Sequence, residues 1–174
     1  MALQEVVAEL NWLKSQGVVA DYAICGAIAA DIYIEPRSTL DVDVFVILKN
    51  PGAIDDMGTV WSALVSRGAT WDGPYLQIGG WPVQLLGQGT LLEQEAIVNS
   101  VDHPFGKETG RVMTAHHLAA IALAVSRPEK DISRIASLLR SKQMDRAALM
   151  DLIVRFNLEA KWEAFQTLMG DGRK

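Results

Sequence analysis

Apolar and polar residues follow two different periods along this chain, and each period predicts a different kind of element. Near the N-terminus, apolar residues recur every three to four positions from Leu3 to Leu13, which predicts an amphipathic helix ended by Gly17. Over the stretch TLDVDVFVIL, at residues 39–48, apolar residues alternate with two acids and then form an apolar run, which predicts a strand. One face of this strand carries Leu40, Val42, Val44 and Val46, and the other carries Asp41, Asp43, Phe45 and Ile47. Two carboxylates therefore share a strand face with two large apolar side chains.

The rest of the chain alternates between the same two kinds of element. A short strand is expected at residues 18–25, a helix at 26–34 and a second helix at 53–68. Residues 69–86 predict short antiparallel strands joined at the DGP and GG turns. Past Thr90 the chain is expected to be mostly helical, with helices at residues 90–99, 114–126, 127–141, 145–155 and 157–168.

This order of elements predicts an α/β (α+β) protein, with a mixed sheet flanked by helices and followed by a C-terminal helical bundle. A length of 174 residues suits one domain, or one domain with a small helical appendage. A boundary between residues 100 and 113 divides the chain into an α/β domain at 1–106 and a helical region at 107–174. Within the helical region, SRPE predicts a capping box with Ser126 as N-cap and Glu129 at N3.

Composition narrows the functional class. Apolar residues make up 49% of the chain and charged residues 21%, as in ordinary globular proteins, and no apolar run is long enough to span a membrane. The net charge of −5 disfavours a nucleic-acid backbone as the main partner, because that role usually needs a basic patch. The single cysteine, Cys25, cannot form an internal disulfide, and the N-terminus lacks the basic start of a signal peptide, so we expect a cytoplasmic protein.

The two acids of the alternating strand suggest a metal site. Side chains at positions i and i+2 point the same way about 6–7 Å apart, so Asp41 and Asp43 could converge on Mg²⁺ (or Mn²⁺) together with substrate phosphates. Gly26 lies between a predicted strand and a predicted helix, where free backbone N–H groups can meet an anion. Between these positions, Arg37 could contact a phosphate and Thr39 could supply a hydroxyl. Together the parts suggest in-line phosphoryl or nucleotidyl transfer.

Each part also has a purely structural interpretation. The two acids could form a solvated strand face, Gly26 could simply make a turn, and Arg37 could be a solvated loop charge. The order in which the parts follow one another along the chain favours the catalytic interpretation.

In that order, the stretch CGAIAADIYIEPRSTLDVDVFV, at residues 25–46, resembles the opening motif of the nucleotidyltransferase-fold superfamily, which includes minimal nucleotidyltransferases and AbiEii-like toxins. The resemblance places Gly26 and Ala27 at a phosphate-binding Gly-Gly or Gly-Ser step, Arg37 and Thr39 at an R-x-T step, and Asp41 and Asp43 at the metal-binding pair. It implies a nucleotidyltransferase-like mixed sheet, a divalent cation and an NTP substrate.

A second stretch carries a looser resemblance. TAHHLAAIALAVSRPEKDISRIASLL, at residues 114–139, is similar to the helical part of small bacterial members of the superfamily. Their R-x-K-D phrase corresponds here to Arg127, Lys130 and Asp131. The resemblance implies that Lys130 reaches a bound nucleotide from the helical region.

Two positions depart from the superfamily pattern. Ala27 replaces a Gly or Ser, and Gln84 in GWPVQLLG stands where active members place a third carboxylate as metal ligand or general base. Gln84 can form hydrogen bonds but cannot take up a proton at neutral pH. Similar PVQ-L phrases occur in a subgroup of bacterial proteins with this fold, so Gln84 could be the solution of that subgroup.

Other side chains could replace the third carboxylate. Asp102 is the better candidate because we place it in a loop, whereas Glu93 and Glu95 are expected on a solvated helix face. His116 and His117 open a helix near the expected cleft between the two parts of the chain, and we expect them on its surface. No set of His and Cys residues has the spacing of zinc ligands.

Two functions stay open at this point. In the first, the protein transfers NMP from an NTP to a hydroxyl of an acceptor that the sequence does not identify, with Asp41, Asp43 and Gln84 as catalytic residues. In the second, a catalytically silent member of the fold binds a nucleotide or a protein partner, as in a toxin–antitoxin-like pair. The paired acids favour the first function and Gln84 favours the second. Apolar helices of the C-terminal half could also form a homodimer interface.

Overall fold

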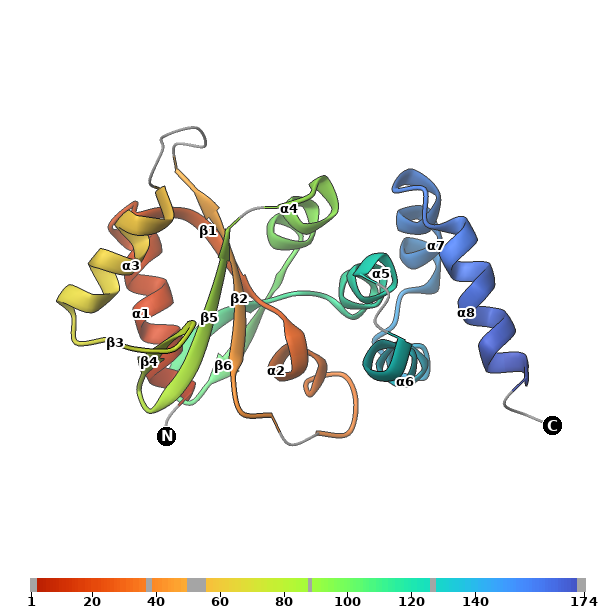
Figure 1. Ribbon diagram of the computed structural model, residues 1–174, viewed down its shortest axis with the longest axis horizontal. Helices are drawn as coiled ribbons and strands as arrows, with labels where there is room; N and C mark the ends of the chain where they lie inside the picture. Colours follow the sequence, from red (N-terminus) through yellow and green to blue (C-terminus); the bar gives the residue numbers. More distant parts are fainter. Residues whose placement is uncertain (1–2, 37–38, 50–55, 88, 126–127, 172–174) are drawn as a thin grey trace.

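A computed structural model describes residues 3–36, 39–49, 56–87, 89–125 and 128–171 of the chain. The first part of the chain is built around a mixed sheet and the last part is helical (Figure 1). The strands are β1 (Val19–Ile24), β2 (Val42–Leu48), β3 (Thr70–Asp72), β4 (Tyr75–Ile78), β5 (Trp81–Gly87), β6 (Val101–Phe105) and β7 (Glu108–Val112). They lie side by side in the order β3-β4-β5-β2-β1-β7-β6.

The strand β2 lies at the centre of the sheet. It pairs antiparallel with β1 and parallel with β5, while β1 pairs parallel with β7. Antiparallel pairing adds β3 and β4 at one side of the sheet and β6 at the other. Paired residues of neighbouring strands point to the same face of a sheet, so the register partners Asp43 and Gln84 lie beside each other on one face.

The helices are α1 (Leu3–Ser15), α2 (Gly26–Ala30), α3 (Asp56–Ser66), α4 (Leu91–Val98), α5 (Ala115–Val125), α6 (Pro128–Leu138), α7 (Arg146–Arg155) and α8 (Glu159–Asp171). Figure 1 shows α1 and α3 on one face of the sheet and α2 and α4 on the other. The helices α5 to α8 lie beyond α2 and α4, and α5 contacts both of them. The helical half therefore packs on one face of the sheet through two short helices.

The predicted alternation is confirmed from Val42 onward, but Leu40, which was expected on the buried face, precedes β2 and is exposed. Val42, Val44 and Val46 are fully buried, whereas Asp43 and Phe45 on the opposite face are half-buried. The valines fill the core on the side of α1 and α3, where a strand face covered by helices has to be apolar. The opposite face of the same strand is left partly open, so it can carry a carboxylate.

The prediction of a mostly helical chain past Thr90 is wrong at residues 101–112, which form the antiparallel pair β6–β7. Pro104 and the glycines at 106 and 110 hide its strand pattern in the sequence. Pro104 is tolerated because β6 is an edge strand, where one backbone N–H can remain outside the sheet. The division of the chain at residues 106/107 falls in the turn of this pair, and the sheet continues to Val112.

The other expected elements are present with shifted ends. The helix expected at 26–34 ends at Ala30 and is followed by a turn. The helices expected in the C-terminal half are confirmed as α4 to α8. The predicted capping box at Ser126 lies outside the described residues. No helix in the described part of the chain is long and apolar enough to cross a membrane.

Candidate active site between the sheet and the helical half

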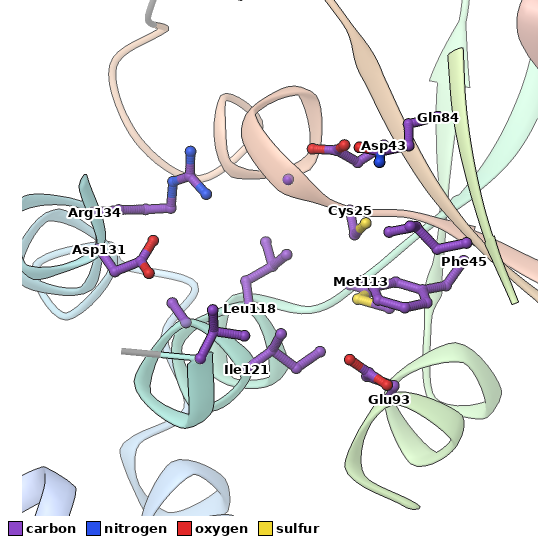
Figure 2. A pocket seen from close by; sticks show the side chains of 14 residues that line it. Cys25, Asp43, Phe45, Gln84, Glu93, Met113, Leu118, Ile121, Asp131 and Arg134 are labelled. Atoms are coloured by element: carbon purple, nitrogen blue, oxygen red, sulfur yellow. The ribbon is translucent and has the colours of Figure 1, made fainter. Parts of the chain in front are cut away.

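A pocket of about 220 Å³ opens between the sheet and the helices α5 and α6. One wall comes from the neighbouring strands β2 and β5, and the other from α4, α5 and α6 (Figure 2). The polar side chains that line it are Asp43, Gln84, Glu93, Asp131 and Arg134. The apolar side chains that line it are Cys25, Phe45, Leu86, Met113, Leu118, Ile121, Ala122 and Val125. Ionisable groups from separate elements thus share a pocket with a largely apolar lining.

Asp43 and Gly26 meet where β1 ends and α2 begins. The N–H of Cys25 donates a hydrogen bond to the backbone carbonyl of Asp43 (2.9 Å), which ties this bend to β2. Gly26 has a φ of +61°, and a Cβ at this position would overlap Oδ2 of Asp43. Glycine is the residue that tolerates both this backbone conformation and this close approach. The sequence CG at the end of β1 therefore leaves the space that the Asp43 carboxylate occupies.

Gln84 lies next to Asp43 on the sheet wall. The two residues are register partners in the parallel pair of β2 and β5, and both line the pocket. The structure therefore brings together two of the three residues that the sequence predicts as catalytic. It also places an amide at the position beside Asp43 where a further carboxylate was expected.

Arg134 brings a positive charge to the pocket from the helical half. It extends from α6 toward the ribbon of α2, and Asp131, one turn earlier on the same helix, is buried beside the pocket with 2% exposure (Figure 2). The sequence prediction assigned this role to Arg37 and Lys130 and missed Arg134. The signal was present, because Arg134 follows Lys130 by four residues and so shares its face of a helix.

Glu93 lines the pocket from α4, so its expected place on a solvated helix face is wrong. The hydroxyl of Thr90, the N-cap residue, accepts from the N–H of Glu93, and the N–H of Thr90 donates to Oε2 of Glu93 (2.6 Å). This capping box fixes the first turn of α4 and turns Glu93 toward the pocket. Burial, and then the charges of Asp43 and Glu93, raise the pKa of the Cys25 thiol well above its usual value. Cys25 is therefore an unreactive neutral thiol, as its apolar setting in the sequence suggests.

Two solved structures share this arrangement of elements along nearly the whole chain. The antibiotic-resistance factor ANT(2'')-Ia, known from a solution structure, superposes with a TM-score of 0.52 at 13% identity, over 98% of this chain and 100% of its own. An antigenic nucleotidyltransferase-like protein from Paracoccidioides brasiliensis superposes with a TM-score of 0.54 at 16% identity, over 94% of each chain. This chain has the nucleotidyltransferase fold. No protein-family model and no curated protein matches its sequence.

The nucleotidyltransferase fold confirms the fold that the sequence motif implies, while membership of the AbiEii-like subgroup stays a prediction. Of the other motif residues, Asp41 and Ala27 are not among the described residues that line the pocket. Asp41 precedes β2, and the hydroxyl of Thr39 donates to its Oδ1 (3.1 Å). Ala27 is half-buried in α2, a helix of only five residues. Arg37 lies outside the described residues, and Lys130 lies on α6 with no described side chain.

The donor set of the pocket fits a hard divalent cation. Asp43 offers a carboxylate and Gln84 an amide oxygen, which are ligands that Mg²⁺ and Mn²⁺ accept. Among the described residues, no group of three or more His, Cys, Asp and Glu side chains is placed to hold a metal ion. Mg²⁺ commonly binds through one or two carboxylates and completes its shell with water and phosphate oxygens. The residues of the pocket thus fit Mg²⁺ as partial ligands, with other oxygens needed to complete its shell.

Asp102 does not replace the third carboxylate, and its prediction as the better substitute is wrong. It lies on β6 at the edge of the sheet rather than in a loop, and its side chain is 70% exposed. Its Oδ1 lies 3.8 Å from the guanidinium of Arg111 on β7. The strands β1 and β7 separate it from β2, so it cannot act with Asp43.

His117 is buried at the start of α5 with 3% exposure, so its expected place on the helix surface is wrong. Its Nδ1 lies 2.7 Å from the hydroxyl of Thr114, and its Nε2 lies 3.7 Å from Glu95 on α4. Burial, assisted by the neighbouring His116, lowers the pKa of His117 to about 4. Glu95 also accepts two hydrogen bonds from Arg155 on α7, which lowers the pKa of Glu95. These residues join α4 to the helical half outside the pocket.

Proposed function

We propose that this protein is a nucleotidyltransferase, which binds an NTP with Mg²⁺ in the pocket and transfers NMP to a hydroxyl of an acceptor. The observation that carries this proposal is the meeting of Asp43, Gln84 and Arg134 beside Gly26, in one pocket of a nucleotidyltransferase fold. A phosphate chain needs cations around it and room at the backbone, and this end of the pocket offers both.

Each of these residues has a role that follows from its chemistry. Asp43 would hold Mg²⁺, which when bound stabilises charge on the phosphate oxygens. The guanidinium of Arg134 donates hydrogen bonds to phosphate and neutralises its charge. Gly26 lets a phosphate approach the backbone without a side chain in between. The sequence adds further candidates for this site, which are Asp41 for the metal and Ala27, Arg37, Thr39 and Lys130 for the phosphates.

The transfer reaction needs a group that accepts the proton of the acceptor hydroxyl, and the site is poorly equipped for this step. The acceptor oxygen forms a bond to the α-phosphorus, the bond to pyrophosphate breaks, and the acceptor proton must pass to a base. Gln84 cannot take this proton, so Asp43 is the member of the pair that can. Asp43 would also hold Mg²⁺, which makes its carboxylate a weaker base. Loss of efficient general-base catalysis costs about a hundredfold to ten-thousandfold in rate, so we expect slow turnover.

Gln84 also supports a second candidate function, a catalytically silent protein that binds a nucleotide as a signal or as part of a complex. The two functions share the binding step and differ in the release of pyrophosphate. A sensitive pyrophosphate assay with a mixture of hydroxyl-bearing small molecules separates them. Release above the buffer background supports the enzyme, and its absence together with nucleotide binding supports the silent protein.

The first test is calorimetric titration with ATP, GTP, CTP and UTP, each with and without Mg²⁺. We expect Mg²⁺-dependent binding of at least one nucleotide, which disappears in Asp43→Asn. In Arg134→Gln the affinity should fall about tenfold, the loss expected for one charge-assisted hydrogen bond. Failure of every nucleotide to bind the wild type at millimolar concentration contradicts the proposal.

Two further variants are compared with these: one is a control for the loss of a charge, and the other tests the second acid. Arg140→Gln removes an exposed guanidinium near the end of α6 that does not line the pocket, and its nucleotide affinity should stay within about twofold of the wild type. Asp41→Asn tests the other acid of the strand motif. If it abolishes binding as Asp43→Asn does, both acids take part in the metal site.

A further inference from the structure

The two ends of the pocket differ in chemistry. One end carries Asp43, Gln84 and Arg134, and the other is formed by α4, α5 and the middle of β2. Figure 2 shows Glu93 well apart from Asp43, on the side of Phe45 and Met113, with Ile121 facing it from α5. The nucleotide phosphates require the first end, which leaves the Glu93 end for another group.

Glu93 has a negative charge that the described protein does not neutralise. Its Oε2 accepts from the N–H of Thr90, and within the described ranges Oε1 has no hydrogen-bond partner. No described Lys, Arg or His lies within ion-pair distance of either oxygen. A half-buried carboxylate in an apolar wall gains most from a cation that brings its own apolar surface.

On this basis we propose that the Glu93 end of the pocket binds the acceptor, and that the acceptor is a small, mainly apolar molecule with one ammonium group and a hydroxyl. This inference rests on the proposed function for the identity of the ligand as an acceptor, and on the pocket alone for its chemistry. The ammonium pairs with Glu93, the apolar body lies against Phe45, Leu86 and Ile121, and the hydroxyl points toward Asp43.

The size and charge of this end select against other occupants. Glu93 can neutralise one ammonium, so a polyamine or a sugar with several amino groups would bring further charges against Met113 and Ile121. A nucleobase would present ring nitrogen and carbonyl acceptors that find no donor side chain among Phe45, Leu86, Met113 and Ile121. A phosphate would be repelled by Glu93.

The capping box provides a variant that separates charge from structure. Glutamine serves at N3 of a capping box as glutamate does, so Glu93→Gln removes the charge and keeps the first turn of α4. Glu93→Ala removes both the charge and the cap. Glu163→Gln, on the exposed face of α8, is the control for the loss of one surface charge.

The probes are 2-amino-1-phenylethanol, which carries ring, hydroxyl and ammonium, and 1-phenylethane-1,2-diol, in which a second hydroxyl replaces the ammonium. We expect calorimetry to show the amine binding about tenfold more tightly than the diol in wild type and in Glu163→Gln. In Glu93→Gln the two probes should bind equally, with an unchanged melting temperature. Equal binding of both probes to the wild type, or no binding of the amine at millimolar concentration, overturns the proposal.

Titration of each variant with Mg·ATP and Mg·GTP distinguishes this proposal from the proposed function. If Glu93→Gln weakens the nucleotide and leaves the amine unaffected, the apolar end holds the base and the acceptor assignment is overturned. If the wild type binds the amine but no nucleotide, the cation subsite stands and the nucleotidyltransferase proposal fails.

Discussion

The two walls of the pocket are held in place by different kinds of interaction. On the sheet wall, Asp43 and Gln84 are set by the backbone register of β2 and β5, so every neighbouring pair of the ladder supports their position. On the helical wall, Ile121 is set by the packing of α5 against α2 and α4, and Arg134 by the packing of α6 against α5. The pair of Glu95 and Arg155 also joins α4 to α7, which packs against α5. The side chains of the sheet wall are therefore held rigidly, whereas the positions of those on the helical wall depend on how the helical half packs against the sheet half.

Gly26→Ala is expected to have the largest effect on stability, because it adds a side chain where Gly26 lies against Asp43 in the sheet wall. The new Cβ overlaps the Asp43 carboxylate, and the φ of +61° is unfavourable for alanine. Together the two costs should lower the free energy of unfolding by about 3 kcal/mol, measured by urea denaturation. Mg²⁺-dependent nucleotide binding should be lost as well, since Asp43 has to move.

Gly73→Ala separates the two costs of that substitution. Gly73 has a similar φ of +58°, but an added Cβ meets no atom within 4 Å. We expect this variant to lose only about 1 kcal/mol and to bind nucleotide as the wild type does. An equal loss in both variants would show that the contact with Asp43 adds nothing to the requirement for glycine.

The same difference between the walls explains what the sequence could predict. Strand alternation has a period of two, so residues 39–48 alone place Asp43 and Phe45 on one face. The resemblance to the superfamily motif supplied Gly26 and pointed to Gln84, and the structure brings both to Asp43. Arg134 was missed and Glu93 was wrongly placed on a solvated face, because the rotation of a helix about its axis follows from tertiary packing. The pair β6–β7 was missed because strand pairing over the edge of a sheet tolerates proline and leaves little local pattern.

Lowering the pH should loosen the helical wall selectively. Folded His117 resists protonation until about pH 4, whereas an unfolded histidine takes up its proton near its ordinary pKa of 6.5. The unfolded state thus binds more protons between these values, and stability is lost as the pH falls from 6.5 toward 4. The charged groups around His117 are His116, Glu95 and Arg155. We expect a loss of about 2 kcal/mol over this interval, measured by urea denaturation at a series of pH values.

His117→Gln tests the origin of this pH dependence. Glutamine does not titrate and can still bond to the hydroxyl of Thr114, so the stability of the variant should depend less on pH between 6.5 and 4. Amide hydrogen exchange should show α5 and α7 opening first in the wild type at low pH, with β2 and β5 still protected. Simultaneous loss of protection in the sheet would contradict the contrast between the two walls.

Gln84→Glu should have the smallest effect on stability, but it should change Mg²⁺ binding at the site directly. A second carboxylate beside Asp43 repels it across the strand pair, so without metal the variant should lose about 0.5 kcal/mol. With Mg²⁺ the variant should instead be more stable than the wild type, because two acids bind the cation more tightly than one and binding stabilises the folded state.

The double variant Asp43→Asn/Gln84→Glu is the control. It returns the pair to one carboxylate, on the other strand, and Mg²⁺ should stabilise it no more than the wild type. Melting curves with EDTA and with Mg²⁺ measure both effects. If Mg²⁺ stabilises the wild type as strongly as Gln84→Glu, the amide at position 84 serves the cation as well as a carboxylate would, and the metal site needs no second acid on β5.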